Sequence, residues 1–190
     1  MAVAALPAPV QPRRRELLFG TAFATAGVVA VMATLIGYYL AARNAGGAEW
    51  FASNTIPLTQ PNMQALTLAM SAITMQWAVY AIARDDRAHT YVALGVTLLL
   101  GAAFINQTIF LYQQAAVLLE SPEGPLFYAV TGGSLAMVIA GMIFIILMGF
   151  RALGGQFSSR QPDGIAAAAV FWYASCAVYA VVWVAVYIMK

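Results

Sequence analysis

Four side-chain amides interrupt an otherwise apolar segment, "GAAFINQTIFLYQQ", which runs from Gly101 to Gln114. Asn106 and Gln113 lie seven residues apart, as do Gln107 and Gln114, so in a helix each pair shares one face, two turns apart. An amide that faces lipid lacks hydrogen-bond partners. We therefore expect the deeper amides, Asn106 and Gln107, to make polar contacts with neighbouring helices. A polar ligand or lipid site at these amides is the alternative.

Hydroxyl side chains recur at helical spacing in two further apolar segments. Thr67, Ser71 and Thr74 follow one another at steps of four and three residues, and Thr131 and Ser134 stand three residues apart. Such steps place residues on one face of a helix. Small and hydroxyl residues on that face let membrane helices approach closely and hydrogen-bond across the contact. We expect these five residues to be interhelical polar contacts.

Residues that catalyse reactions or hold metals are few in this sequence. The single histidine, His89, stands in the charged segment "ARDDRAHTY", and the single cysteine, Cys176, excludes an internal disulfide and a Cys-cluster metal site. Glu120 and Glu123 are close together, but "LLESPEGP" is typical of a solvated turn. No Ser-His-Asp set or Gly-rich phosphate loop can be assembled. The sequence therefore predicts no catalytic residue, no metal ligand and no cofactor in this chain itself.

The composition indicates a membrane protein. Of the 190 residues, 63% are hydrophobic and only 8% are charged, whereas a soluble domain usually has about 25% charged residues. Such a chain cannot cover itself with a polar surface. The formal net charge of +2 is small, so nucleic acid is not expected as a partner.

Clusters of charged residues divide the chain into five long intervals without Asp, Glu, Lys, Arg or His. A spanning helix needs about 20 apolar residues, so each interval can hold one. Pro61 suits the first turn of the second helix. The predicted fold is all-α: a single five-helix transmembrane domain over residues 16–190, after a disordered basic tail at residues 1–15. The expected helices are residues 17–42, 61–83, 90–119, 125–150 and 164–189.

The placement of arginine and lysine predicts the orientation in the membrane. With a cytoplasmic N-terminus, seven of the nine basic residues lie inside and two, Arg43 and Lys190, lie outside. The seven are Arg13, Arg14, Arg15, Arg84, Arg87, Arg151 and Arg160. This is the bias of the positive-inside rule. The C-terminus is then expected outside.

Five segments, in chain order, carry a family resemblance. They read "LTLAMSAITMQWA" from Leu66, "LLLGAAFINQ" from Leu98, "FYAVTGG" from Phe127, "LMGFRAL" ending at Leu153, and "AVVWVAVYIMK" from Ala180. They resemble segments of subunit III of haem-copper cytochrome c oxidases: "ML..SS.T...A", "LG..F...Q", "FY..TG.H..H", the arginine after the penultimate helix, and "DVVW..L......Y". The resemblance is to the five-helix bacterial form, in a diverged version.

The departures from that family concern its ionisable positions. Similar positions of this chain carry uncharged side chains, while the packing framework remains. These positions are Thr21, Phe110, Ser134, Met137, Ala177 and Ala180. Roles in assembly and lipid binding survive such changes better than a role that needs a carboxylate.

The resemblance implies a non-catalytic accessory subunit of a respiratory haem-copper oxidase in a bacterial plasma membrane. It implies haem and copper in partner subunits, contacts with subunit I and other subunits of the complex, and support of assembly, lipid binding and stability in aerobic electron transport. Gln107 then takes the family's glutamine position. Arg151 becomes a contact for an anionic phospholipid, and a charge that only sets orientation is its alternative reading.

Three other functions remain open at the level of sequence. The chain could be an accessory subunit of a nitric oxide reductase-type complex, which belongs to a related class. It could be a small membrane transporter with a neutral path lined by amides. It could also be an assembly factor that leaves before the complex matures. Co-purification with haem proteins would favour the reductase subunit or the assembly factor over the transporter.

Overall fold

The computed structural model describes residues 15–47, 50, 56–115, 117–154 and 163–189, and over these residues the protein is all-helical. Five helices are long and apolar enough to cross a membrane, as predicted. The chain is therefore a multi-pass membrane protein. The predicted N-terminal tail lies outside the described residues, apart from Arg15. The helices are α1 (Glu16–Gly46), α2 (Thr59–Ala83), α3 (Arg87–Ala115), α4 (Gly124–Leu153) and α5 (Asp163–Val182), and α5 continues into a π-helix, η2 (Trp183–Ile188).

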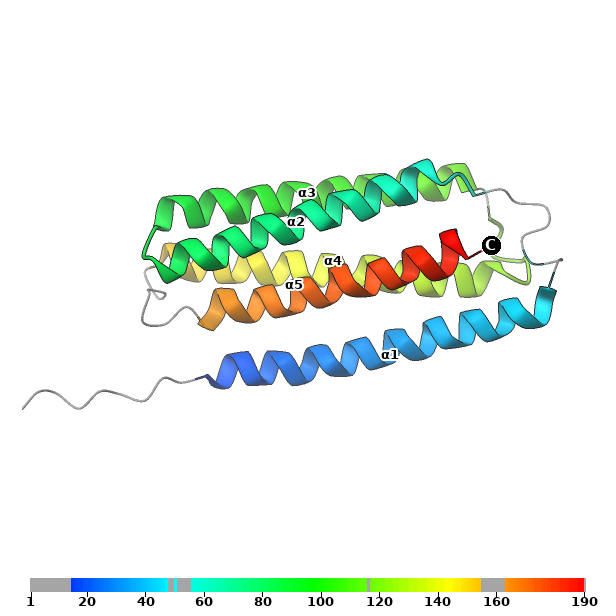
Figure 1. Cartoon of the computed structure of the whole chain (residues 1–190), viewed down its shortest axis with the longest axis horizontal. Coiled ribbons are helices and arrows are strands. Elements are labelled where there is room, and N and C mark those ends of the chain that lie inside the picture. The colour runs from blue at the N-terminus through cyan, green and yellow to red at the C-terminus, as the bar shows by residue number, and fades with distance from the viewer. Residues whose placement is uncertain (1–14, 48–49, 51–55, 116, 155–162, 190) are drawn as a thin grey trace, which may run out of the picture.

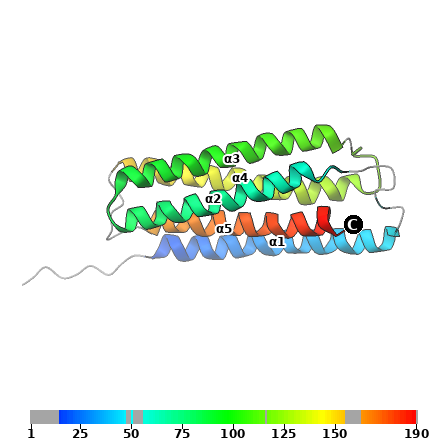
Figure 2. The ribbon, with the colours of Figure 1, turned by 45° about the horizontal axis from the view of Figure 1, so that its top comes forward.

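The five helices run side by side along the long axis of the molecule (Figure 1). α1 and α3 lie at opposite edges of the bundle in Figure 2. α2 packs chiefly on α3, whereas α1 packs on α5 and α4, and α5 also contacts α2 and α4. The most central helix is thus the last one in the chain, and the first helix is peripheral.

α3 begins three residues earlier than expected, at Arg87, because the polar residues before Thr90 form its first turn. The Oδ1 atom of Asp86 accepts a hydrogen bond from the backbone N–H of His89 at 3.1 Å. This is the N-cap geometry that satisfies an otherwise unpaired donor at a helix start. Asp85, with φ 58°, makes the sharp reversal from α2. The charged loop is therefore shorter than the sequence suggested.

The other end of α3 lies at Ala115 rather than the expected Leu119. The residues that follow form a turn, in which Ser121 N donates to Leu118 O at 3.1 Å and Gly124 N donates to Ser121 O at 3.1 Å. A side chain on Gly124 would collide with the Leu118 carbonyl. The absence of a Cβ there lets α4 begin directly against the turn.

α1 extends four residues beyond its expected end at Ala42, to Gly46. It stops where Gly47 adopts φ 54°, a left-handed conformation that glycine adopts without steric cost. The Gly47 N–H donates to Arg43 O. This bond is the usual helical contact between residues four apart, and it completes the last turn of α1.

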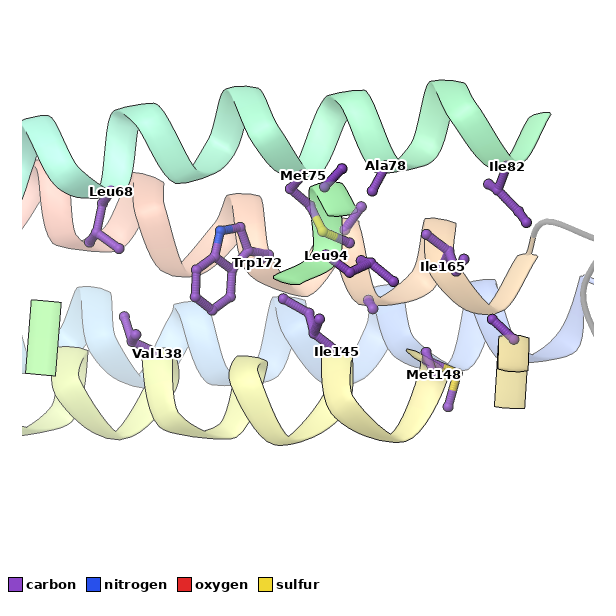
Figure 3. Packing of buried hydrophobic residues seen from close by; sticks show 14 of the residues in the cluster. Leu68, Met75, Ala78, Ile82, Leu94, Val138, Ile145, Met148, Ile165 and Trp172 are labelled. Atoms are coloured by element: carbon purple, nitrogen blue, oxygen red, sulfur yellow. The ribbon is translucent and has the colours of Figure 1, made fainter. Parts of the chain in front are cut away.

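Two clusters of buried side chains form the core. The first joins α2, α3, α4 and α5 and contains Trp172, which is fully buried. Figure 3 shows Trp172 between α2 and α4, with its indole nitrogen turned toward α2. The second cluster joins α1, α3, α4 and α5 with η2 at the opposite end of the bundle, and it includes Tyr39, Phe127 and Tyr187. Most of the large aromatic contacts lie in this second cluster.

Candidate functional site

Three pairs of polar side chains connect α2 to α3. Gln64 Nε2 donates to Thr108 Oγ1 at 2.9 Å. Gln107 Nε2 donates to Thr67 Oγ1 at 3.2 Å. The hydroxyls of Thr74 and Thr97 lie 2.8 Å apart. The pairs are spread along the length of two antiparallel helices, so they fix the register between them.

Gln64 is the centre of a buried polar cluster that also contains Thr108 and Tyr179, here called the glutamine cluster. Its side chain is 1% exposed. The Tyr179 hydroxyl donates to Gln64 Oε1 at 2.6 Å, while the Gln64 amide donates to Thr108. Thr108 in turn donates to the Phe104 carbonyl at 2.9 Å. Because both ends of the amide are satisfied, Gln64 joins α2, α3 and α5 without an unpaired polar group in the core.

Ser71 joins α2 to α5 in the middle of the bundle. The Trp172 Nε1–H donates to Ser71 Oγ at 3.1 Å, and Ser71 donates to Leu68 O at 2.7 Å. The Sγ atom of Cys176 lies 4.0 Å from the same Oγ. A buried indole N–H usually finds a partner. Ser71 supplies that partner, and the contact orients the largest side chain of the core.

Thr131 and Ser134 are both buried on α4 but differ in what they join. The Tyr112 hydroxyl of α3 donates to Thr131 Oγ1 at 3.0 Å. Thr131 donates to the Phe127 carbonyl of its own helix. Ser134 donates to the Thr131 carbonyl at 2.7 Å, so its hydrogen bond stays within α4. Of these two predicted interhelical residues, the structure thus brings Thr131 to a side chain of another helix.

The two deeper amides of α3 point in different directions. Gln107 is half-buried against Thr67, whereas Asn106 is exposed on the outside of the bundle. Asn106 has no hydrogen-bond partner among the residues that the structure describes. Gln113 and Gln114 are exposed near the end of α3. Consecutive residues of a helix are separated by about 100°, so one contact cannot hold both amides.

Arg151 is exposed in the last turn of α4. The neighbouring Ala152 carbonyl accepts a hydrogen bond from the Tyr91 hydroxyl at 3.1 Å, which places the end of α4 beside the start of α3. Arg84 and Arg87 lie at this same end of the bundle, where Arg84 packs over the Tyr80 ring. The end of the molecule that carries Arg151 is therefore rich in arginine.

The residues that the sequence missed include two partners of predicted residues, Thr97 and Trp172, and the whole glutamine cluster. Gln64, Thr97, Thr108, Trp172 and Tyr179 make most of the interhelical side-chain hydrogen bonds described above. A signal for Gln64 was present, because it stands seven residues before Ser71 and so on the same helix face. The tyrosine and tryptophan of α5 stood among many aromatic residues without a comparable pattern.

The Asp, Glu, His and Arg side chains that the structure describes lie near the ends of the helices. His89 Nδ1 and Asp86 Oδ2 are 2.7 Å apart in the exposed turn before α3. Glu123 is 6% exposed while Glu120 is exposed, so the expectation of a solvated turn is wrong for Glu123, which sits where the turn packs under α4. Among the described residues, no group of three or more His, Cys, Asp or Glu side chains is arranged to hold a metal ion.

An apolar groove of about 550 Å³ lies between α1 and α5. Small residues of both helices line it, among them Ala33, Gly37 and Ala177, together with Ile36 and Val181. A second hollow of about 400 Å³ shares Ile36 and Val181 and continues toward Met189. The contact between α1 and α5 is thus less tightly filled than the core around Trp172.

Comparisons with known proteins place this bundle in one family. The sequence model of cytochrome c oxidase subunit III matches residues 19–190. Cytochrome c oxidase subunit 3 of Bos taurus is 30% identical over 132 residues, which are 69% of this chain and 51% of the relative. The same protein of Bos mutus grunniens and of Tragelaphus imberbis matches with the same identity and coverage. The chain spans about half the length of these curated relatives.

Proposed function

Because the chain belongs to the cytochrome c oxidase subunit III family, we propose that it is a non-catalytic accessory subunit of a respiratory haem-copper oxidase. The observation that carries this proposal is the family match over residues 19–190, which covers α2 to α5 and all but the first three residues of α1. The role is to support the assembly, lipid binding and stability of the catalytic subunit in aerobic electron transport.

The proposed partners are subunit I and other subunits of the oxidase, which hold the haem and copper. The proposed location is a bacterial plasma membrane, with the N-terminus in the cytoplasm. Arg15, Arg84, Arg87 and Arg151 support this orientation, since they lie at one end of the bundle and Arg43 lies at the other. Basic residues are enriched on the cytoplasmic side of membrane proteins.

Affinity purification through a tag on this chain tests the proposal. Native membranes are solubilised in mild detergent, and the purified material is examined for haem spectra, copper and the identity of its subunits. We expect a haem- and copper-containing oxidase subunit to co-purify with this chain. Recovery with a nitric oxide reductase-type subunit, or without any redox subunit, would contradict it.

Arg151 is the proposed contact for an anionic phospholipid. It is exposed in the last turn of α4, where a long side chain can extend to the headgroups. Its planar guanidinium donates to phosphate in a bidentate manner, which a lysine ammonium cannot reproduce. Arg151→Lys keeps the charge that sets orientation, so it separates the lipid role from the orientation role.

We expect Arg151→Lys to insert normally and to retain less phosphatidylglycerol or cardiolipin. Native mass spectrometry of the purified complex measures the retained lipid. Arg84→Lys is the matched control, since Arg84 lies at the same end but stacks on the ring of Tyr80. Equal lipid retention in wild type and Arg151→Lys would leave Arg151 with the orientation role alone.

A further inference from the structure

Asn106 is an amide on the outer surface of α3, at a depth where lipid offers no hydrogen bonds. α3 has 29 residues, which at 1.5 Å per residue gives a length of about 44 Å. Its midpoint is Gly101, so Asn106 lies about 7 Å beyond it along the axis. The hydrocarbon core extends about 15 Å to either side of its centre. For a centred helix, the Asn106 amide is inside the hydrocarbon region.

The short side chain of asparagine cannot carry its amide out of that region. About 8 Å of hydrocarbon separate Asn106 from the nearer interface on the same estimate. Long side chains such as lysine and arginine bridge distances of this kind by extending toward the headgroups, and asparagine has a single methylene. Gln113, seven residues further along, lies about 18 Å from the midpoint and reaches the interface. The two amides on this face therefore differ in access to water.

Three amides that lie deeper in the helices than the unpaired Gln60, in the first turn of α2, already have partners. Gln64 bonds to Thr108 and Tyr179, Gln107 bonds to Thr67, and Gln76 accepts from the Tyr173 hydroxyl at 2.7 Å. Asn106 differs from these amides in that none of the described residues hydrogen-bonds to it. An unpaired amide in an apolar medium costs several kcal/mol, which a bare lipid contact would leave uncompensated.

The surroundings of Asn106 also suit a neighbouring helix. Exposed residues follow one another on this face at alternating steps of four and three, which we call the outer stripe of α3. The outer stripe consists of Gly95, Leu99, Ala102, Asn106, Ile109 and Gln113. Gly95 and Ala102 leave the backbone accessible, and small residues combined with an amide are typical of contacts between membrane helices. None of these residues belongs to either core cluster.

We propose that the outer stripe of α3 is the docking surface for a transmembrane helix of another oxidase subunit, which presents a hydrogen-bonding side chain to Asn106. The inference rests on the proposed function, because that function supplies a membrane partner. A single serine, threonine, asparagine or glutamine of the partner helix, at the depth of Asn106, satisfies the amide. Gly95 and Ala102 set the distance between the two helix backbones.

Photo-crosslinking locates the partner. A photoreactive residue replaces Ala102, one turn from Asn106, in the full chain within native membranes, and a second variant carries it at Val31. Val31 is 61% exposed on α1, a helix that lies at the opposite edge of the bundle from α3 (Figure 2). We expect the Ala102 variant to label a polar residue-containing spanning peptide of another oxidase subunit, and the Val31 variant to label lipid. Labelling of lipid alone, or of a second copy of this chain, from position 102 would overturn the proposal.

Substitution of Asn106 measures its contribution. Since Asn106 is exposed, Asn106→Leu should leave the thermal unfolding midpoint of the isolated chain unchanged while weakening its association with the oxidase about three- to twentyfold. Leu99→Ile on the same stripe is the control and should associate as wild type does. Undiminished association of Asn106→Leu would overturn the inference alone, since wild-type co-purification would still support the accessory role. Absence of oxidase subunits from the wild-type preparation would overturn both.

Discussion

The interactions that hold α2 to α5 together differ from those that hold α1 against them. The four helices α2 to α5, here called the body, enclose Trp172 and are joined by side-chain hydrogen bonds from Gln64, Ser71 and Gln107. α1 lies against the body largely through apolar side chains such as Met32 and leaves a groove beside α5. Half of the most apolar window of α5 is buried, against 17% of that of α1. Polar pairs and close packing hold the body together, whereas apolar contacts hold α1 against the body.

The difference follows from what holds helices together in lipid. Lipid tails are as apolar as leucine, so burying leucine between helices gains little there. Close packing and interhelical hydrogen bonds provide the specificity instead. Substitutions in the body and in α1 should therefore have unequal effects.

The largest effect is expected for Gly141→Leu in the body. A Cβ on Gly141 would lie 2.9 Å from the Trp172 ring, and this ring is held by Gly101 and Ser71 on its other sides. We expect a loss of about 3 kcal/mol in unfolding free energy or failure to fold. Gly27→Leu on α1, where nothing lies within 4 Å, should change it by less than about 0.5 kcal/mol. Unfolding in mixed detergent micelles measures both, and equal effects would refute the distinction.

Gln64→Leu should have the next largest effect. It removes two hydrogen bonds and leaves the Tyr179 hydroxyl with the more distant Pro61 carbonyl, at 3.3 Å, as acceptor. We expect a destabilisation of about 1–3 kcal/mol. The control is Thr34→Val on α1, whose hydroxyl bonds to the Ala30 carbonyl of its own helix. If the two variants unfold at the same denaturant fraction, the glutamine cluster does not stabilise the body.

Gln107→Leu should cost less, about 0.6–1.7 kcal/mol. Its partner Thr67 also donates to the Met63 carbonyl at 2.7 Å, so the threonine keeps a hydrogen bond after the amide is removed. The same unfolding measurement, combined with a flux assay, tests whether Gln107 holds two helices together or lines a transport path. A variant of unchanged stability with altered solute flux in proteoliposomes would favour a transporter.

The smallest expected effect is a loosening of the first turn of α3 as the pH falls. The backbone N–H of His89 bonds to the Asp86 carboxylate and lowers the pKa of Asp86 below its ordinary value. A lowered folded-state pKa means that this contribution is present above the unfolded-state pKa and is lost as pH falls through the folded-state pKa. Amide exchange in the first turn of α3, corrected for intrinsic rates, should accelerate in acid. The first turn of α1, which has no side-chain cap, and the variant Asp86→Asn should show no such change.

The number, type and approximate places of the helices followed from the sequence because charge clusters bound each apolar interval. The ends of α3 did not, because Asp86 and Ser121 close turns through local hydrogen bonds that apolarity does not register. The π-helical geometry of η2 also gave no signal in the sequence. Its carbonyl at Ala185 accepts from Arg43 Nη1 at 3.1 Å, a contact between residues 142 positions apart.

The sequence indicated which types of residue make polar contacts between helices, but it did not indicate which residues pair with each other. Asn106 and Gln107 were both expected to contact neighbouring helices, and only the rotation of α3 decides which one faces α2. That rotation depends on Gln64 and Thr74 of α2, which hydrogen-bond to Thr108 and Thr97 of α3. Helical spacing shows which residues share one face of a helix, but only the tertiary structure shows which helix packs against that face.

The peripheral position of α1 has a consequence for biosynthesis. α1 leaves the ribosome before α2 to α5, yet its partners are α4 and α5, and about 140 residues separate Gly46 from the end of η2. At roughly 5–20 residues per second, α1 waits about 7–30 s in the bilayer before its site exists. α2 has no such wait, because α3 follows it directly and supplies partners for Gln64, Thr67 and Thr74. The helix that waits longest for its partners is thus one that packs on them largely through apolar side chains.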